Sequence, residues 1–255
     1  MHASAKIIWI TSALWLGLIT EQRQAAIAAP RGIVEHEGMA TGAETGMFLA
    51  RAEGNVILTS PNARIWCLQT AQVPPDCHKV VGGNGILVRV GYRAGLETSK
   101  DGVWWTRRNP GVPNRLYAAA FGNGVFVAVG NEGALVTSTD GVRWTACNSR
   151  TDERLRGVVF GQGQFVVVGY EGTVLCSKDG RHWIRHRSGI DEHLLDVAYG
   201  RGLFVAVGWH GTVLVSRNAI RWSPRDVGIS LQLRSVVFGS DALLATGQGD
   251  ASYKR

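Results

Sequence analysis

Charged residues are scarce in this sequence, and their scarcity limits the classes of protein it can belong to. Only 18% of the 255 residues are charged, and no run of five or more Lys or Arg occurs. The formal net charge of +7 is therefore spread thinly. It gives solubility and a mild preference for anionic partners, whereas an arm that binds nucleic acid would concentrate its charge. We predict no nucleic-acid partner.

Long apolar stretches are missing too. The apolar stretch at residues 7–19 is short for a membrane span. It follows Lys6 and precedes a small-residue site at residues 26–28. We therefore predict a cleaved secretory signal over residues 1–29, with an uncleaved anchor as the alternative. The mature protein would be periplasmic or secreted, without stable membrane insertion.

Catalytic and metal-binding signatures are absent as well. The chain has no G-x-S-x-G, H-E-x-x-H, C-x-x-C or Walker A pattern. His182 and His186 are four positions apart on an expected strand, where they would span roughly 13 Å and could not share one ion. We predict no metal, no cofactor and no enzymatic activity.

Cysteines are few, and export would permit them to pair. Four cysteines allow three pairings. Cys67 and Cys77 bracket a short polar loop and are predicted to form a disulfide. Cys147 and Cys176 lie in adjacent repeats, and both a bridge and two free thiols remain open for them.

What the chain does contain is a regular repeat, rich in Gly (33) and Trp (9). Each copy has four short segments of β-branched and aromatic residues separated by Gly and Asp turns; residues 155–193 read LRGVVF, QFVVVG, TVLCS and HWIRHR. No helical i, i+3, i+4, i+7 pattern occurs after residue 30. We predict an all-β fold over residues 30–255, a single β-propeller of four-stranded antiparallel blades with about 39 residues per blade.

The two ends of the repeat array leave the number of blades open. Five copies are complete and a sixth lacks its Trp segment. Residues 31–37 (RGIVEHE) could supply the missing outer strand, so we expect six blades closed by joining the two ends of the chain. Five blades with an extension, a solenoid, and a truncated copy of a longer propeller are the alternatives. We expect a monomer.

A Ser-x-Asp-Gly-x-x-Trp box marks the turn between the third and fourth segments. It reads SKDGVWW at residues 99–105, STDGVRW at 138–144 and SKDGRHW at 177–183. Asp can accept backbone N–H bonds across such a turn, and Gly can take a positive φ. The terminal copies have Asn-Ala instead, so we expect another turn type at Ala63 and Ala219. We assign structural roles to Asp101, Asp140, Asp179, Trp66, Trp105, Trp144, Trp183 and Trp222.

These motifs carry a resemblance over residues 46–247. The box resembles a shortened Asp-box, the bacterial neuraminidase repeat, and FVAVG-x-x-G-T-V-L-x-S-x-D-G-x-x-W resembles the propeller repeat of the photosystem II stability and assembly factor family. The resemblance implies a propeller whose Asp-boxes lie away from the working surface. That family usually has seven blades, more than this chain can form. Sialidases share the box, but the Arg-Ile-Pro sequence they would need is absent.

The residues that break the repeat are the candidate binding residues. In a propeller, the loops between second and third strands share one face with the loops that join blades, and such loops commonly bind ligands. Variable residues also fill the blade junctions, such as 150–154 and 191–193. Tyr117 and Tyr199 occupy apolar strand positions and are expected in the core. The candidate loop face consists of Tyr92, Arg93, Asn131, Glu132, Tyr170, Glu171, Trp209 and His210.

The absence of a catalytic constellation and the variable aromatic and charged rim favour one function. We predict an exported, non-catalytic binding or assembly module whose partner is an unidentified protein or glycan. A glycan-binding lectin, in which the same aromatic residues stack on sugars, is the first alternative. A sialidase-type glycoside hydrolase is the second.

Overall fold

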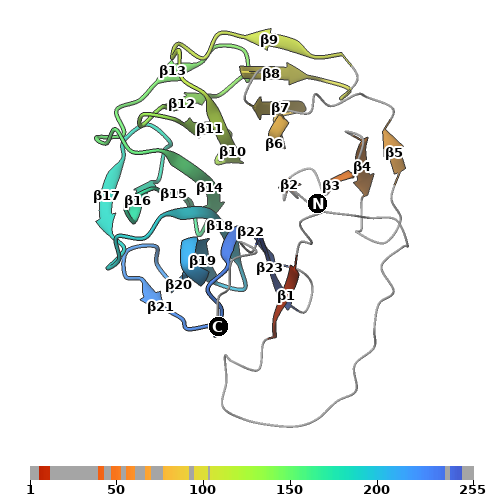
Figure 1. Cartoon of the computed structure of the whole chain (residues 1–255). Helices are drawn as coiled ribbons and strands as arrows, with labels where there is room; N and C mark the ends of the chain where they lie inside the picture. Colours follow the sequence, from red (N-terminus) through yellow and green to blue (C-terminus); the bar gives the residue numbers. More distant parts are fainter. Residues whose placement is uncertain are drawn as a thin grey trace.

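The computed structural model of the chain consists of antiparallel sheets arranged around an axis (Figure 1). It describes residues 77–91, 95–102, 104–238 and 242–248, together with five strands nearer the N-terminus. Those five are β1 (Lys6–Thr11), β2 (Ala40–Gly42), β3 (Met47–Ala52), β4 (Val56–Ser60) and β5 (Cys67–Gln69). No helix in the described part is long and apolar enough to cross a membrane.

Five sheets have four strands each and follow one another along the chain in the order predicted by the repeat. The first is β2–β5. The other four are β6 (Cys77–Gly83), β7 (Ile86–Gly91), β8 (Gly95–Ser99) and β9 (Thr106–Arg108); β10 (Leu116–Gly122), β11 (Val125–Gly130), β12 (Leu135–Ser138) and β13 (Thr145–Ala146); β14 (Leu155–Gly161), β15 (Gln164–Gly169), β16 (Thr173–Ser177) and β17 (Ile184–Arg187); and β18 (Leu194–Gly200), β19 (Leu203–Gly208), β20 (Val213–Ser216) and β21 (Ser223–Pro224).

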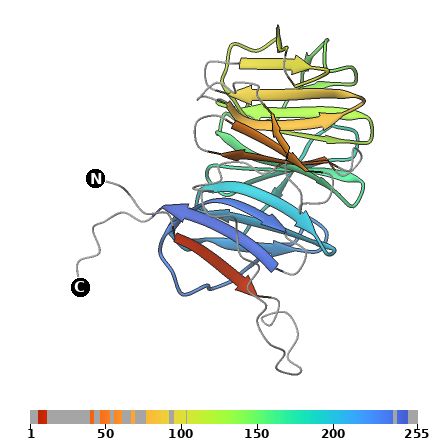
Figure 2. The ribbon, with the colours of Figure 1, turned by 90° about the vertical axis from the view of Figure 1, so that its right-hand side faces the viewer.

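The sheets are blades of a propeller, as the sequence predicted. The first strand of each blade faces the axis and the fourth lies outermost (Figure 1), and seen from the side the blades stack face to face (Figure 2). Innermost strands of successive blades pack on each other, β6 against β10, β10 against β14 and β14 against β18. The all-β propeller of four-stranded antiparallel blades is therefore confirmed.

A sixth sheet combines the two ends of the described chain. It has three strands in the order β1–β23–β22, with β22 spanning Gln232–Phe238 and β23 spanning Ala242–Gln248. β1 pairs antiparallel with β23, from Lys6 opposite Gly247 to Thr11 opposite Ala242.

The segment that joins this sixth sheet differs from the prediction. The strand beside β23 is β1, an apolar β-branched run with high strand propensity, and residues 31–37, which the sequence analysis placed in this blade, lie outside the described residues. β1 falls within the stretch predicted as a secretory signal, and cleavage of that signal stays a prediction.

The second strand of each blade is buried on both sides. In β15, Val166 and Val168 belong to the apolar cluster shared with the following blade, whereas Val167 belongs to the cluster shared with the preceding one. All three side chains are fully buried. Because both faces of this strand pack against a neighbouring blade, its sequence is an unbroken apolar run rather than an alternating one.

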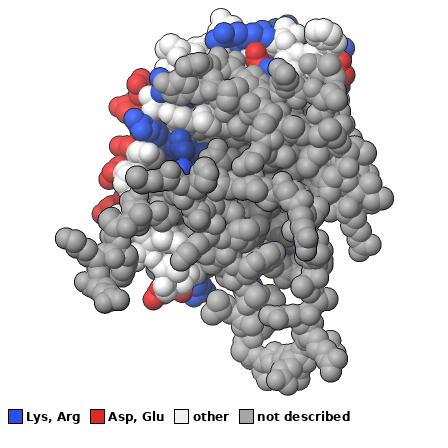
Figure 3. All heavy atoms as spheres, turned by 45° about the vertical axis from the view of Figure 1, so that its right-hand side comes forward, with Lys and Arg blue, Asp and Glu red and all other residues white. Residues whose placement is uncertain are grey.

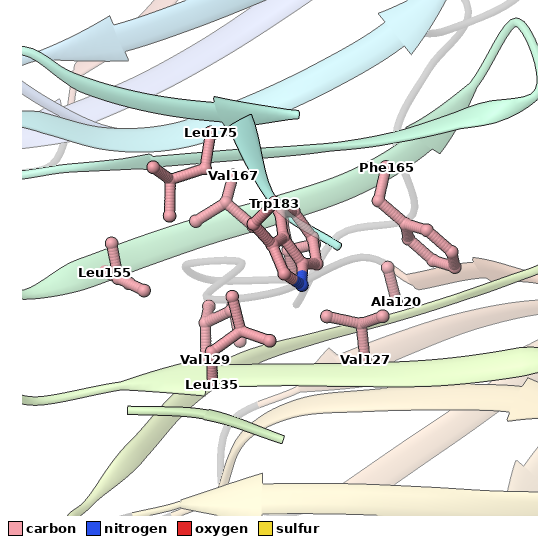
Figure 4. Close-up of a cluster of buried hydrophobic side chains, with 11 residues drawn as sticks. Ala120, Val127, Val129, Leu135, Leu155, Phe165, Val167, Leu175 and Trp183 are labelled. Carbon is pink, nitrogen blue, oxygen red and sulfur yellow. The ribbon is translucent and has the colours of Figure 1, made fainter. Parts of the chain in front are cut away.

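Trp183 closes the cluster between two blades from the outside. Its ring lies against Val167 and Leu175 of its own blade and faces Val127 and Leu135 of the preceding blade (Figure 4). Only 4% of the residue is exposed. Nearer the axis a glycine is required, because a Cβ on Gly161 would lie 2.2 Å from the Tyr199 ring of the next blade.

The box turn is held by hydrogen bonds from its own Ser, Asp and Trp. The Gly141 N–H donates to Ser138 Oγ (2.9 Å), and the N–H groups of Val142 and Arg143 both donate to Asp140 Oδ1 (2.8 Å each). In the next blade, Trp183 Nε1 donates to the Gly180 carbonyl (3.0 Å). Equivalent bonds occur at Trp105, Trp144 and Trp222; Asp101 and Asp179 repeat the role of Asp140. Trp66 lies outside the described residues.

The Asn-Ala copy of the box does not change turn type, contrary to expectation. Ala219 adopts φ +60°, close to the +69° of Gly141 and the +72° of Gly180. Asn218 Oδ1 still accepts the N–H groups two and three positions further on (3.0 Å each). These bonds and the complete burial of Ala219 offset a left-handed penalty of about 1–2 kcal/mol. Ala63 lies outside the described residues.

Cys147 and Cys176 are free thiols, which decides between the two possibilities that the sequence left open. Each sulfur faces a carbonyl in the box turn of the next blade, 3.8 Å away for Cys147 and 3.5 Å for Cys176. Burial raises the pKa of the Cys147 thiol, and it raises the pKa of Cys176 to about 12. The side chains of the predicted Cys67–Cys77 pair lie outside the described residues.

Replacing Trp183 by Ala should lower the free energy of unfolding by about 3–5 kcal/mol, because a large ring is removed from a closed cluster. The matched control is Trp104→Ala. Trp104 is 80% exposed, so its loss should change stability by less than about 0.5 kcal/mol. Urea denaturation measures both values, and equal effects of the two substitutions would contradict this packing.

The loss of folding stability at acid pH should depend partly on Asp140. Hydrogen bonds from the backbone N–H groups of Arg143 and then Val142 hold the pKa of its carboxyl well below the usual range. The carboxylate therefore stabilises the fold above the unfolded-state pKa of about 3.9, and this contribution is lost as the pH falls below it. Asp140→Asn keeps both bonds, as Asn218 does. Its melting temperature should fall less than that of the wild type between about pH 5 and about pH 2, and parallel curves would refute the assignment.

Candidate functional site

One face of the propeller is built from the turns between second and third strands and from the junctions that enter each blade. The Tyr170 N–H donates to the Arg154 carbonyl of the incoming junction (2.9 Å), and the Gly172 N–H donates to the Glu192 carbonyl of the outgoing junction (3.0 Å). The preceding and following blades repeat both bonds at the equivalent turns, which begin at Asn131 and Trp209. The two kinds of loop therefore form one bonded surface.

The turns themselves are tight and place two side chains each. In residues 170–173 the Thr173 N–H donates to the Tyr170 carbonyl (3.0 Å), and both central residues have positive φ, +51° for Glu171 and +57° for Gly172. This is the type I′ geometry of a two-residue hairpin. A non-Gly residue with positive φ is uncommon. Glu132 and His210 adopt the same conformation in their blades, so the backbone is constant where the side chains vary.

Three aromatic rings gather on this face between the blades β14–β17 and β18–β21. The Tyr170 and His193 rings stack with centroids 3.9 Å apart and planes 9° apart, and Trp209 lies 4.5 Å from His193. The guanidinium carbon of Arg154 lies 5.5 Å from the centroid of the Tyr170 ring. Trp209 belongs to a single 3₁₀ turn, η2 (Trp209–Gly211). The aromatic cluster consists of Tyr170, His193 and Trp209.

Two carboxylates lie beside the histidines of this face. The Glu171 N–H donates to His193 Nδ1 (3.3 Å), and the carboxylate of Glu171 lies 3.7 Å from the same nitrogen. His210 Nδ1 lies 3.0 Å from Glu192 Oε2. Each of these pairs joins a rim turn to a junction: Glu171 of the turn meets His193 of the junction, and His210 of the next turn meets Glu192 of the junction.

A pocket of about 440 Å³ opens beside this cluster, between the blades β10–β13 and β14–β17. Among its described lining residues, the carboxylates are Glu132, Asp152 and Glu153, and the cation is Arg154. Asn131 and Tyr170 complete the lining. The acidic pocket, as we call these six residues, offers three acidic groups against one basic group beside an aromatic ring.

Charged side chains of both signs lie on the described part of the surface in Figure 3. Asp and Glu follow one another along the left edge of that view with Lys and Arg beside them, whereas both signs are adjacent at its top and bottom.

The structure brings six of the eight predicted rim residues to this face: Asn131, Glu132, Tyr170, Glu171, Trp209 and His210. Tyr92 and Arg93 lie outside the described residues. Asp152, Glu153, Arg154 and His193 belong to junctions that were predicted on this face, but they were not among the eight candidate residues. The sequence feature that could have identified them is their position in the repeat. Arg154 and His193 occupy the same place in successive repeats, directly before an innermost strand.

Among the described residues, no group of His, Cys, Asp and Glu has the arrangement of a metal site. The acidic pocket can bind a cation by charge and hydrogen bonds.

Comparisons with known proteins identify the fold alone. A scan against models of protein families finds no match, and no curated protein matches the sequence. Among solved structures, the chain is similar to "YCF48 bound to D1 peptide", with 16% identity and a TM-score of 0.56, covering 84% of this chain and 76% of that one. It is also similar to the WD40 propeller domain of Doa1 (13%, TM-score 0.60, 85% and 80%) and to YCF48 from Cyanidioschyzon merolae (13%, TM-score 0.50, 88% and 97%).

Gly172→Ala should disrupt the bonded face. A Cβ at Gly172 would lie 2.0 Å from the Ile190 carbonyl oxygen, so the rim turn must separate from its junction. The control is Gly163→Ala in the same blade, where φ is +70° and no described atom lies within 4 Å of the new Cβ. Gly163→Ala should cost only the left-handed penalty of about 1–2 kcal/mol, and Gly172→Ala clearly more. Thermal unfolding compares them, and equal losses would contradict the close approach.

Proposed function

We propose that the chain is an exported, non-catalytic propeller that binds an extended segment of a partner protein across this loop face. The observation that supports the proposal is the acidic pocket and the aromatic cluster side by side on a rigid backbone, sharing Tyr170. Aromatic and charged groups on a preorganised surface are common energetic anchors of interfaces.

The negative charge of the acidic pocket favours a partner with a basic side chain. Glu132, Asp152 and Glu153 outnumber Arg154, so a Lys or Arg side chain is the favoured occupant. Its charge would be met by carboxylates, and Tyr170 lines the same pocket. The preferred ligand is therefore a segment with a basic residue followed or preceded by an apolar one.

A neighbour in fold supports this mode of binding. One of the similar solved propellers is described as bound to a peptide. At 16% identity the likeness extends to the fold, and the residues that would hold a peptide here are this chain's own.

A lectin is the less favoured reading because the aromatic faces are already used. Tyr170 stacks on His193 and has Arg154 near its ring, and Trp209 packs against His193. Sugar binding requires an exposed aromatic face. A sialidase would require turnover, which a fluorogenic sialoside tests directly.

The test uses a displayed library of peptides selected on the immobilised full chain. Selection should enrich peptides with Lys or Arg beside an apolar residue. The double charge reversal Glu132→Arg, Asp152→Lys should weaken the enriched peptides at least about tenfold, because charge-assisted hydrogen bonds become repulsive. Tyr170→Ala should also weaken them.

The matched control is Trp104→Ala, an exposed aromatic residue in a box turn on the opposite face. It should leave peptide affinity unchanged. Absence of an enriched basic motif, or equal affinity of wild type and charge reversal, would overturn the proposal. Displacement of the peptides by free sugar would favour the lectin.

A further inference from the structure

The innermost strands carry a β-bulge at one repeated position. In β14, Leu155 pairs with Gly169 and Gly157 pairs with Val168, so Arg156 is an extra residue between them. The strands β6, β10, β18 and β22 skip one residue at the equivalent position. Bulges re-aim a side chain and are common next to functional sites. The bulge ring consists of the residues at this position in successive repeats: His78, Tyr117, Arg156, Leu195 and Arg234.

Three successive members of the bulge ring contact one another across the blades. The guanidinium carbon of Arg156 lies 4.5 Å from the centroid of the Tyr117 ring, and the Tyr117 ring lies 5.8 Å from that of His78. Tyr117 was expected in the core because it occupies an apolar strand position. The bulge instead turns it toward the neighbouring bulge residues and leaves it partly exposed.

The two arginines of the bulge ring have no acidic partner among the described residues. Neither Arg156 nor Arg234 forms an ion pair there; Arg156 Nε is buried without an acceptor, and Arg234 bonds only the Gln232 amide oxygen (3.2 Å). Asp196, the acidic residue next to Leu195, is occupied: Ser235 Oγ and the Val236 N–H donate to it (3.0 and 2.9 Å). Arg156 therefore has a buried donor without an acceptor among the described residues, whereas Arg234 is exposed.

The bulge ring lies on the same face as the acidic pocket. Arg156 is two positions beyond Arg154, whose carbonyl accepts the rim-turn N–H of Tyr170. Both sites therefore lie at the start of the innermost strands, which face the axis (Figure 1).

We infer that the bulge ring binds an anionic group, a carboxylate or a phosphate, at the start of the innermost strands. A guanidinium presents paired N–H groups that match the oxygens of either anion. Its stacking on Tyr117 holds it in place before binding, so less side-chain freedom is lost on complex formation. The site is independent of the basic peptide residue proposed for the acidic pocket.

The test follows the Arg156 Nε–H signal of the full chain by nitrogen-proton NMR, with the signal assigned by its absence in Arg156→Lys. Titration with inorganic phosphate and with acetate at constant ionic strength should move this signal saturably. Arg156→Gln should weaken binding about tenfold or more, read from the shifts of neighbouring backbone amides. Arg156→Lys should recover only part of it, because an ammonium lacks the paired donors.

The matched control is Arg217→Gln, an exposed arginine in a box turn on the opposite face, and it should bind as the wild type does. Tyr117→Leu should weaken binding severalfold by removing the stacking platform. A linear, unsaturating shift, or equal binding by Arg156→Gln and wild type, would overturn the site. Circular dichroism of each variant excludes misfolding as the cause of a loss.

A second titration identifies the source of the anion. A blocked peptide with one Glu, compared with its Gln counterpart, should bind more tightly than acetate if the natural carboxylate belongs to a protein chain. Tighter binding of inorganic phosphate than of that peptide would assign the site to a phosphate-bearing ligand. Each result supports the anion site, and failure of all three probes would refute it.

Discussion

The structure depends on the burial of one strand between two neighbours. In β15, Val166 and Val168 face the following blade and Val167 faces the preceding one, and none of them is exposed. A blade taken alone would leave both apolar faces in water, so no repeat can be stable without its neighbours. This requirement accounts for the constant apolar second strand, for the buried Trp of the box, and for the glycine that contacts the aromatic ring of the next blade.

The same packing makes the loop face rigid without using its side chains. Each described rim turn is hydrogen-bonded through its backbone to the junctions on both sides. These backbone bonds do not depend on the side chains at Tyr170, Glu171 or Trp209. Variation is thereby confined to side chains that extend from a constant frame. A repeat protein can acquire a binding surface in this way without loss of its core.

The propeller, its strand order and the four-stranded blades could be predicted from the sequence because period, apolar pattern and turn residues all agree. The aromatic and charged rim could be located for the same reason. The core position predicted for Tyr117 was wrong, because a β-bulge changes the direction of its side chain and no local sequence pattern marks the bulge. The turn at Ala219 was misjudged since its hydrogen bonds and burial outweigh a local preference.

The sequence by itself determined the blades, since a regular repeat of apolar strands and Gly turns has few ways to hide its surface from water. Tertiary structure alone decided which residues meet. His193, from a blade junction, stacks on Tyr170 of an earlier rim turn, and Arg156 lies over Tyr117 of the preceding blade. Such contacts arise between blades, where the rotation from one sheet to the next sets the distances between side chains. That rotation depends on the packing of all the blades, so no single segment of the sequence determines it.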